Sequence, residues 1–130
     1  MVAFLMMILL HIIDDFVLQP VCLSKLKQKS FWDKYNKESN GLYKRDYKVA
    51  LFIHALSWSI MIHTPIFMCF DVPSDFLYGL SVFVWALMHA KIDNDKANKK
   101  CISLVFDRTF HFIQIVGLYI VYYLIDLKCC

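Results

Sequence analysis

Four long apolar stretches leave this chain few ways to fold. They run from Val2 to Leu18, Val49 to Phe70, Phe76 to His89 and Ile102 to Ile125. A helix needs about 20 apolar residues to cross a bilayer, with a range of about 17 to 25. With 59% hydrophobic residues in 130, the chain is too apolar for an ordinary soluble domain, although a soluble bundle of unusually apolar helices is the alternative. We therefore predict an all-α integral membrane four-helix bundle. Residues 1–130 would form one transmembrane domain with spans at about 2–19, 49–70, 75–93 and 102–125.

Basic residues are concentrated in two of the three connections between these stretches. The connection from Pro20 to Lys48 has eight basic and three acidic residues, the connection after His89 has four lysines, and residues 71–75 have no basic residue. The positive-inside rule then places the first and third connections in the cytoplasm and both termini outside, in a bacterial or phage-infected host inner membrane. Lysines beside Phe31 and Trp32 predict a cytoplasmic interfacial helix or loop after the first span. The lipid bilayer explains the basic run, so no nucleic-acid partner is expected.

Three of the apolar stretches carry a histidine and an aspartate four residues apart. The pairs are His11 with Asp15, His89 with Asp93, and Asp107 with His111. Residues at positions i and i+4 share a helix face, so each pair presents both groups in one direction. In the predicted topology these pairs and His54 lie within about two helical turns of the cytoplasmic face. His63 lies about 13 Å further along its helix and is predicted to stay apart.

Seven side chains would then meet in one polar pocket: His11, Asp15, His54, His89, Asp93, Asp107 and His111. An aspartate facing lipid costs about 3 kcal/mol on insertion scales, so these groups must pair, bind something or reach water. Four imidazoles and three carboxylates, without sulfur, suit one or two ions of zinc, iron or manganese. The candidate catalytic carboxylates are Asp15, Asp93 and Asp107. Further polar residues that could orient ligands or substrate are Asp14, Gln19, Lys96, Arg108 and Gln114.

The polar segments also resemble a known family. The runs His11-Ile-Ile-Asp-Asp15-Phe-Val-Leu-Gln19, His89-Ala-Lys-Ile-Asp93-Asn-Asp-Lys96 and Asp107-Arg-Thr-Phe-His111, with His54, resemble small bacterial and phage membrane proteins catalogued as domain of unknown function 3307. The pattern is also similar to that of membrane-bound metal-dependent hydrolases. Family members have a glutamine after the last aspartate, where this chain has Arg108. The resemblance implies a membrane protein but supplies no mechanism.

The site composition predicts a metal-dependent hydrolase acting on a phosphate- or ester-containing substrate near the cytoplasmic face. Two divalent ions and three aspartates carry a net charge of +1, which would attract an anion such as a lipid phosphate or a small cytosolic phosphate. Proton relay without a metal is the main alternative to metal binding. A metal-ion or proton transporter or channel component could use the same core, and so could a phage or bacterial interaction protein with a structural polar core. An oligomer is compatible with the sequence.

Overall fold

The computed structural model describes residues 1–19, 21–37, 39–72 and 74–129. These residues form six α-helices and one π-helical turn, with no strand among them, so the all-α prediction is confirmed. The elements are α1 (Val2–Ile13), the π-helical turn η1 (Asp14–Leu18), α2 (Val21–Leu26), α3 (Lys29–Asn36), α4 (Asp46–Cys69), α5 (Asp75–Ala97) and α6 (Leu104–Cys129).

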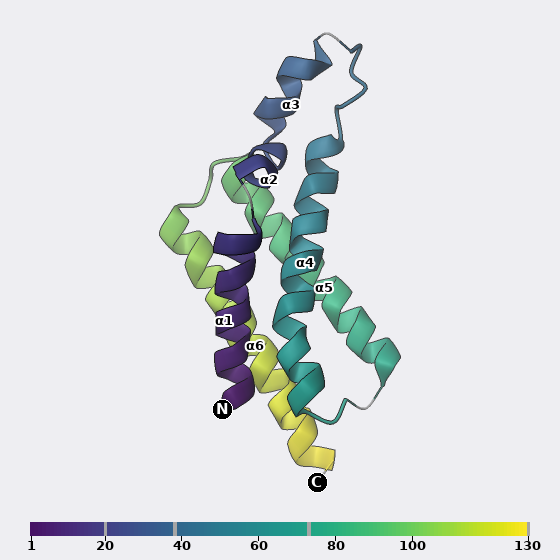
Figure 1. The fold of residues 1–130 in the computed structure, drawn as a ribbon, viewed down its shortest axis with the longest axis vertical. Coiled ribbons are helices and arrows are strands. Elements are labelled where there is room, and N and C mark those ends of the chain that lie inside the picture. Colours follow the sequence, from purple (N-terminus) through teal and green to yellow (C-terminus); the bar gives the residue numbers. More distant parts are fainter. Residues whose placement is uncertain (20, 38, 73, 130) are drawn as a thin grey trace.

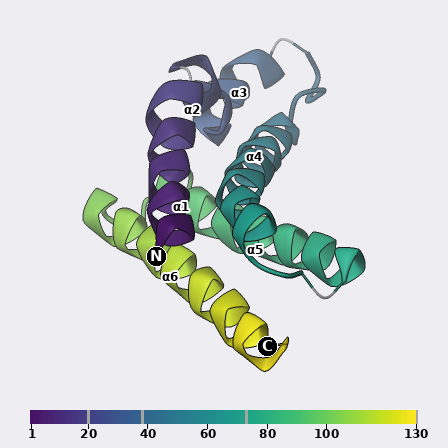
Figure 2. The ribbon, with the colours of Figure 1, turned by 60° about the horizontal axis from the view of Figure 1, so that its bottom comes forward.

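The long helices form a bundle whose two ends differ (Figure 1). Both termini and the connection between α4 and α5 lie at one end, whereas α2, α3 and the connection between α5 and α6 lie at the other. In both views α6 runs obliquely to α1 rather than parallel to it (Figure 2). The two basic connections therefore share one end of the bundle, as the charge pattern predicts.

Local sequence signals account for several of these boundaries. Ser74 precedes α5, and its hydroxyl accepts a hydrogen bond from the backbone N–H of Leu77 at 3.5 Å, which makes it the N-cap. Asn40 and Gly41 have φ values of 50° and 83°, a left-handed conformation that these residue types tolerate and that turns the chain toward α4. The interfacial segment predicted after the first apolar stretch is two short helices, α2 and α3.

The apolar core fills the half of the bundle nearer the termini. Its buried members come from α1, α4 and α6 and are Met7, Trp58, Ile62, Ile66, Ile115, Leu118 and Tyr122. Large apolar side chains also cover the outside, in stripes with helical spacing. On α1 and η1 the exposed stripe is Val2, Leu5, Leu9, Ile12 and Phe16, and on α5 it is Phe76, Leu80, Phe83 and Leu87. The exposed faces of these helices are therefore apolar, although the buried face of α5 includes His89 and Asp93.

Within the described residues, two helices are long and apolar enough to cross a membrane, judged by length and composition. They are Asp46–Cys69 in α4 and Leu104–Leu127 in α6. The α1 helix has 12 residues before its π-helical turn, and α5 ends in a charged run that includes Asp93, Asp95 and Lys96. The four-span arrangement therefore stays a prediction, supported for two of its segments.

Candidate metal centre

Eight His and Asp side chains from α1, η1, α4, α5 and α6 gather at the end of the bundle nearer α2. They form four overlapping groups of three, and within each group the ligand atoms lie within 4.8 Å of one another. The groups are His11, Asp15 and His111; Asp14, Asp15 and His54; His54, His89 and Asp93; and Asp93, Asp107 and His111. All seven predicted ligands are present, together with Asp14. These groups could hold a metal ion.

Two imidazole nitrogens lie close together between α4 and α5. His54 Nε2 is 3.4 Å from His89 Nε2 and 3.5 Å from Asp93 Oδ2, and His89 Nε2 is 3.8 Å from Asp93 Oδ1. Two ligands of a tetrahedral zinc ion, bonded at about 2.0–2.1 Å, lie about 3.3–3.4 Å apart. The three side chains therefore already stand close to the separations that a tetrahedral ion requires.

A second group lies beside the first and shares Asp93 with it. His111 Nε2 is 3.7 Å from both Asp93 Oδ1 and Asp107 Oδ1. Both ring nitrogens of His111 and Asp107 Oδ1 are buried and have no hydrogen-bond partner among the described residues. Leaving a buried polar group unpaired costs about 1–3 kcal/mol, so a cation that took up these lone pairs would remove a penalty. Asp93 Oδ1 lies near both His89 and His111, and its Oδ2 lies near His54, so this carboxylate is shared by the two groups.

The π-helical turn η1 carries two consecutive aspartates that both reach the interior. Successive side chains of a helix point about 100° apart, so neighbouring residues can share a buried face, as they also do in α4. In η1 Asp14 and Asp15 are both buried. Ser57 on α4 donates to Asp14 Oδ1 at 2.7 Å, and Asp15 Oδ1 lies 3.7 Å from His54 Nε2. Single π-helical turns occur often at functional sites.

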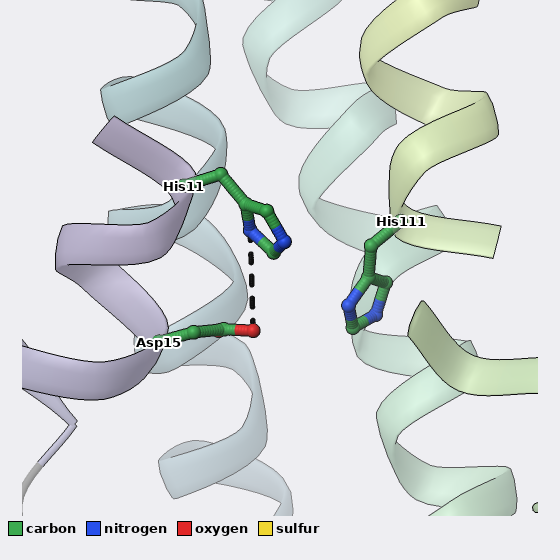
Figure 3. Close-up of side chains that lie close together, drawn as sticks. All are labelled: His11, Asp15 and His111. Carbon is green, nitrogen blue, oxygen red and sulfur yellow. Dashed lines mark ion pairs between the residues drawn. The ribbon is translucent and has the colours of Figure 1, made fainter. Parts of the chain in front are cut away.

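His11 is the predicted ligand whose lone pair is already engaged. The indole N–H of Trp58 donates to His11 Nδ1 at 2.7 Å. A neutral imidazole has one nitrogen that accepts and one that donates, so Nε2 of His11 carries the proton. Figure 3 shows His11 and Asp15 facing His111 across the site, with Asp15 Oδ2 3.9 Å from His11 Nδ1. Ligation through Nδ1 would require the Trp58 hydrogen bond to break.

An aromatic column holds the imidazoles in place. The fully buried Trp58 ring stacks on His89 with a centroid distance of 4.1 Å, and His89 stacks on His111 at 4.2 Å. The ring of His11 meets that of His111 edge-on at 5.8 Å. Three histidines from three helices are therefore oriented by one tryptophan, which sequence spacing did not identify.

Each central aspartate also contacts a basic side chain. Lys27 Nζ lies 2.7 Å from Asp93 Oδ2 and Lys96 Nζ 2.5 Å from Asp107 Oδ2, and Arg108 pairs with Asp15 Oδ2. On Asp15 and Asp107 the other oxygen, Oδ1, faces an imidazole. Arg108 and Lys96 thus orient the carboxylates of Asp15 and Asp107 and leave Oδ1 of each facing an imidazole. Residues that support metal ligands commonly orient them in this way.

Lys27 is the functional candidate that sequence reasoning missed. It is one of eight basic residues between positions 20 and 48, and nothing in its neighbours singles it out. The structure buries it to 7% exposure, which is rare for lysine unless it is paired. Only the folding of α2 over the end of the bundle brings it to Asp93.

The site opens into a cavity of about 360 Å³. Its polar lining comes from η1, α4, α5, α6 and the connections beside them and includes Asp15, Gln19, Lys27, His54, Asp93, Lys96, Lys100, Asp107, Arg108 and His111. Three of the predicted orienting residues, Gln19, Lys96 and Arg108, therefore lie at the cavity. Gln114 is buried, and its side-chain amide has no partner within the described part of the chain.

His63 lies apart from this cluster and belongs to none of the metal-compatible groups found in the described residues. Its Nδ1 lies 2.8 Å from the backbone oxygen of Ser59, and its Nε2 lies 3.0 Å from Ser81 Oγ. It is as deeply buried as His89, so burial alone does not distinguish the two. What separates them is that both His63 nitrogens already have hydrogen-bonding neighbours.

No protein-family model, curated protein or solved structure matches this chain. This finding overturns the resemblance to the proteins catalogued as domain of unknown function 3307, which rested on short spaced motifs. The absence of a matching family model leaves the candidate site to be interpreted from its own residues.

Proposed function

We propose that this chain is an integral membrane metal-dependent hydrolase with a two-ion site near the cytoplasmic face. The observation that carries the proposal is the convergence of His54, His89 and Asp93 at near-tetrahedral separations, next to unpartnered His111 and Asp107. A site of mixed imidazole and carboxylate ligands suits zinc, iron or manganese.

Asp93 is the carboxylate that would bridge the two ions. The first ion would be held by His54, His89 and the Asp93 carboxylate, with Asp15 Oδ1, 3.7 Å from His54 Nε2, as a fourth ligand. The second would be held by Asp93 Oδ1, Asp107 Oδ1 and His111 Nε2. His11 would orient the site through Trp58 and join as a ligand only on giving up that hydrogen bond.

Ions held there would lower the pKa of a water molecule and polarise a phosphoryl oxygen. Instead of serving as the fourth ligand, Asp15 would accept the proton of the attacking water, because its Oδ1 faces the centre. The water oxygen bonds to phosphorus, the ester P–O bond breaks, and the leaving alkoxide takes up the proton from the carboxylate. Hydrolysis of a phosphate ester is thereby complete without any redox partner.

The apolar core favours hydrolysis over transport through the same residues. A pathway toward the other side would have to continue from Trp58 past Ile62 and Ile66, which are fully buried apolar side chains. His63 has hydrogen-bonding neighbours on Ser59 and Ser81 and contacts no ligand group in the parts of the chain described. A site confined to one level of the bundle suits catalysis.

The exposed apolar stripes support four spans. A soluble protein rarely exposes continuous apolar surface, yet α1 and α5 carry such stripes although neither helix passes the span test by itself. With four spans, α2, α3 and the connection between α5 and α6 would face the cytoplasm, and both termini would lie outside.

Native cysteines test this topology. Cys22, Cys69 and Cys101 are exposed, the first and last at the basic end and Cys69 at the other. In single-cysteine variants, a membrane-impermeant maleimide should label Cys69 from outside intact cells, and Cys22 and Cys101 only in inverted vesicles. Labelling of Cys69 and Cys101 from the same side would show that α5 does not cross the membrane.

The metal site itself is tested by a matched pair of histidine variants. We expect His89→Ala to lose at least one bound ion per chain and to lower p-nitrophenyl phosphate hydrolysis by about 100-fold or more, since even loss of a supporting residue costs 10–100-fold. His63→Ala removes an equally buried imidazole and should keep both the ions and the activity. Elemental analysis and steady-state rates provide the measurements. Equal losses in the two folded variants would contradict a localised site and favour a structural polar core.

A further inference from the structure

We infer that Lys27, Lys96, Lys100 and Arg108 form a binding site for a phosphate monoester group, and that Lys27 couples this anion to metal binding. The inference rests on the proposed function and names its substrate class. All four cations line the same cavity as the central carboxylates.

The charge of the cavity favours an anion over a neutral substrate. Its lining has four permanently basic side chains against three carboxylates, a surplus of one positive charge with neutral imidazoles. Each divalent ion adds two more positive charges. A phosphate monoester dianion is the ligand that compensates such a surplus, and guanidinium and ammonium groups are its usual partners in proteins.

A metal ion would compete with Lys27 for the carboxylate of Asp93. The Nζ of Lys27 lies 2.7 Å from Asp93 Oδ2, the same oxygen that lies 3.5 Å from His54 Nε2. An ion bound between His54, His89 and Asp93 would take up this oxygen and repel the ammonium. The ammonium group then has to leave Asp93 and find another anionic partner.

The backbone of Lys27 is anchored, so its side chain would remain in the cavity. Asn98 Nδ2 donates to the backbone oxygen of Lys27 at 3.1 Å, and the N–H of Lys29 donates to Asn98 Oδ1 at 2.6 Å. The end of α2 is thereby held against the end of α5. A displaced Lys27 ammonium would therefore move within the space that Lys96 and Arg108 also face.

Lys96 and Arg108 complete the anion site from the other side. Their side chains are about one-third exposed, at 32% and 35%. Lys96 contacts Asp107 Oδ2, and Arg108 contacts Asp15 Oδ2 and, at 3.7 Å, Asp107 Oδ2. Arginine has five N–H donors in a planar fork, so Arg108 keeps donors for a phosphate after pairing with Asp15. The volume of about 360 Å³ is at the small end of ligand pockets and suits a phosphate with a short attached group.

The surroundings of Arg108 would also let a lipid phosphate reach the site. Its guanidinium lies 5.3 Å from the ring centroid of Phe16 on η1. Phe16, Val105 and Phe106 are all more than half exposed beside it and would contact acyl chains in a bilayer. The phosphate monoester could thus come from a lipid or from solution, and the two sources share the same cationic contacts.

The test measures the Mn²⁺ affinity of the full chain in phosphatidylcholine nanodiscs. We expect inorganic phosphate in the buffer, or phosphatidate in the disc, to tighten Mn²⁺ binding by about tenfold, and Mn²⁺ to tighten anion binding by the same factor. A shift with phosphatidate alone identifies a lipid substrate, and one with inorganic phosphate alone a soluble substrate. Lys27→Met should keep or strengthen Mn²⁺ binding and remove the coupling. Lys25→Met, on the exposed side of the same helix, should preserve the coupling.

The outcomes separate this inference from the proposed function. If Mn²⁺ binds but neither anion changes its affinity, the anion site is wrong and the metal site stands. If coupling persists in Lys27→Met, Lys27 is only a structural counter-ion. If Mn²⁺ does not bind and His89→Ala changes nothing, the proposed function fails together with this inference.

Discussion

Replacing Asp93 by asparagine is expected to remove both ions and to weaken metal affinity by more than about 100-fold. Among the described residues Asp93 is the carboxylate that contacts His54, His89 and His111, with Oδ2 toward the first and Oδ1 toward the other two. An amide offers one neutral oxygen and cannot bridge two cations with the same charge. The effect should exceed that of His89→Ala, which removes a ligand from one group only. Elemental analysis of the purified variant measures it.

The same substitution should also lower the free energy of unfolding, because it leaves Lys27 buried without its counter-ion. Breaking a buried ion pair from one side costs about 3–5 kcal/mol. Asp95→Asn is the matched control, since Asp95 pairs with the largely exposed Lys99 and should cost less than about 1 kcal/mol. In the double variant with Lys27→Met, stability should recover and metal binding should not. Retention of two ions in Asp93→Asn would refute the bridging assignment.

Replacing Trp58 by alanine is expected to destabilise the fold by about 3–5 kcal/mol, the usual cost of removing a buried tryptophan. Trp58 is fully buried, belongs to the apolar core, and stacks on His89. Its loss would therefore open a cavity between the core and the metal centre. The His89 ring, which stacks on Trp58, and the His111 ring, which stacks on His89, would then be free to reorient. Denaturant titration in mixed micelles, followed by circular dichroism, measures the change.

Trp58→Phe is the informative control. Phenylalanine keeps most of the stack but lacks the N–H that donates to His11 Nδ1. Trp58→Phe should lower the free energy of unfolding by about 1 kcal/mol, because one hydrogen bond is lost, and should leave His89 in place. Metal binding should persist in this variant. If Trp58→Phe costs as much as Trp58→Ala, the hydrogen bond to His11 rather than packing holds the centre together.

Sequence periodicity was sufficient to find the long helices and the residues that meet between them. The His/Asp spacing of four residues put both groups of each pair on one helix face, and the alternation of basic and non-basic connections placed His11, His54, His89 and His111 at one level. The same reasoning set His63 apart, and the structure places it with Ser59 and Ser81. These features depend only on helix geometry and chain direction, so they can be read without tertiary information.

Other parts of the site depend on contacts that no local pattern encodes. Lys27 reaches Asp93 only because Asn98 ties α2 to the end of α5. In the sequence, nothing distinguishes Trp58 from the other aromatic residues of the apolar helices. Its role follows from the stacking of its ring on His89. Asp14 is buried beside Asp15 in a π-helical turn, and the four-residue His/Asp spacing did not include it among the ligands. The family resemblance was wrong because short polar motifs in apolar helices recur without common ancestry.

The π-helical turn at Asp14–Leu18 combines two kinds of surface within one short stretch of chain. A turn closed over five residues holds one more amino acid than an α-helical turn over a similar rise. In it Asp14 and Asp15 are buried, whereas Phe16 continues the exposed apolar stripe of α1. A shift of one residue at this turn would therefore exchange a buried carboxylate for a phenyl ring.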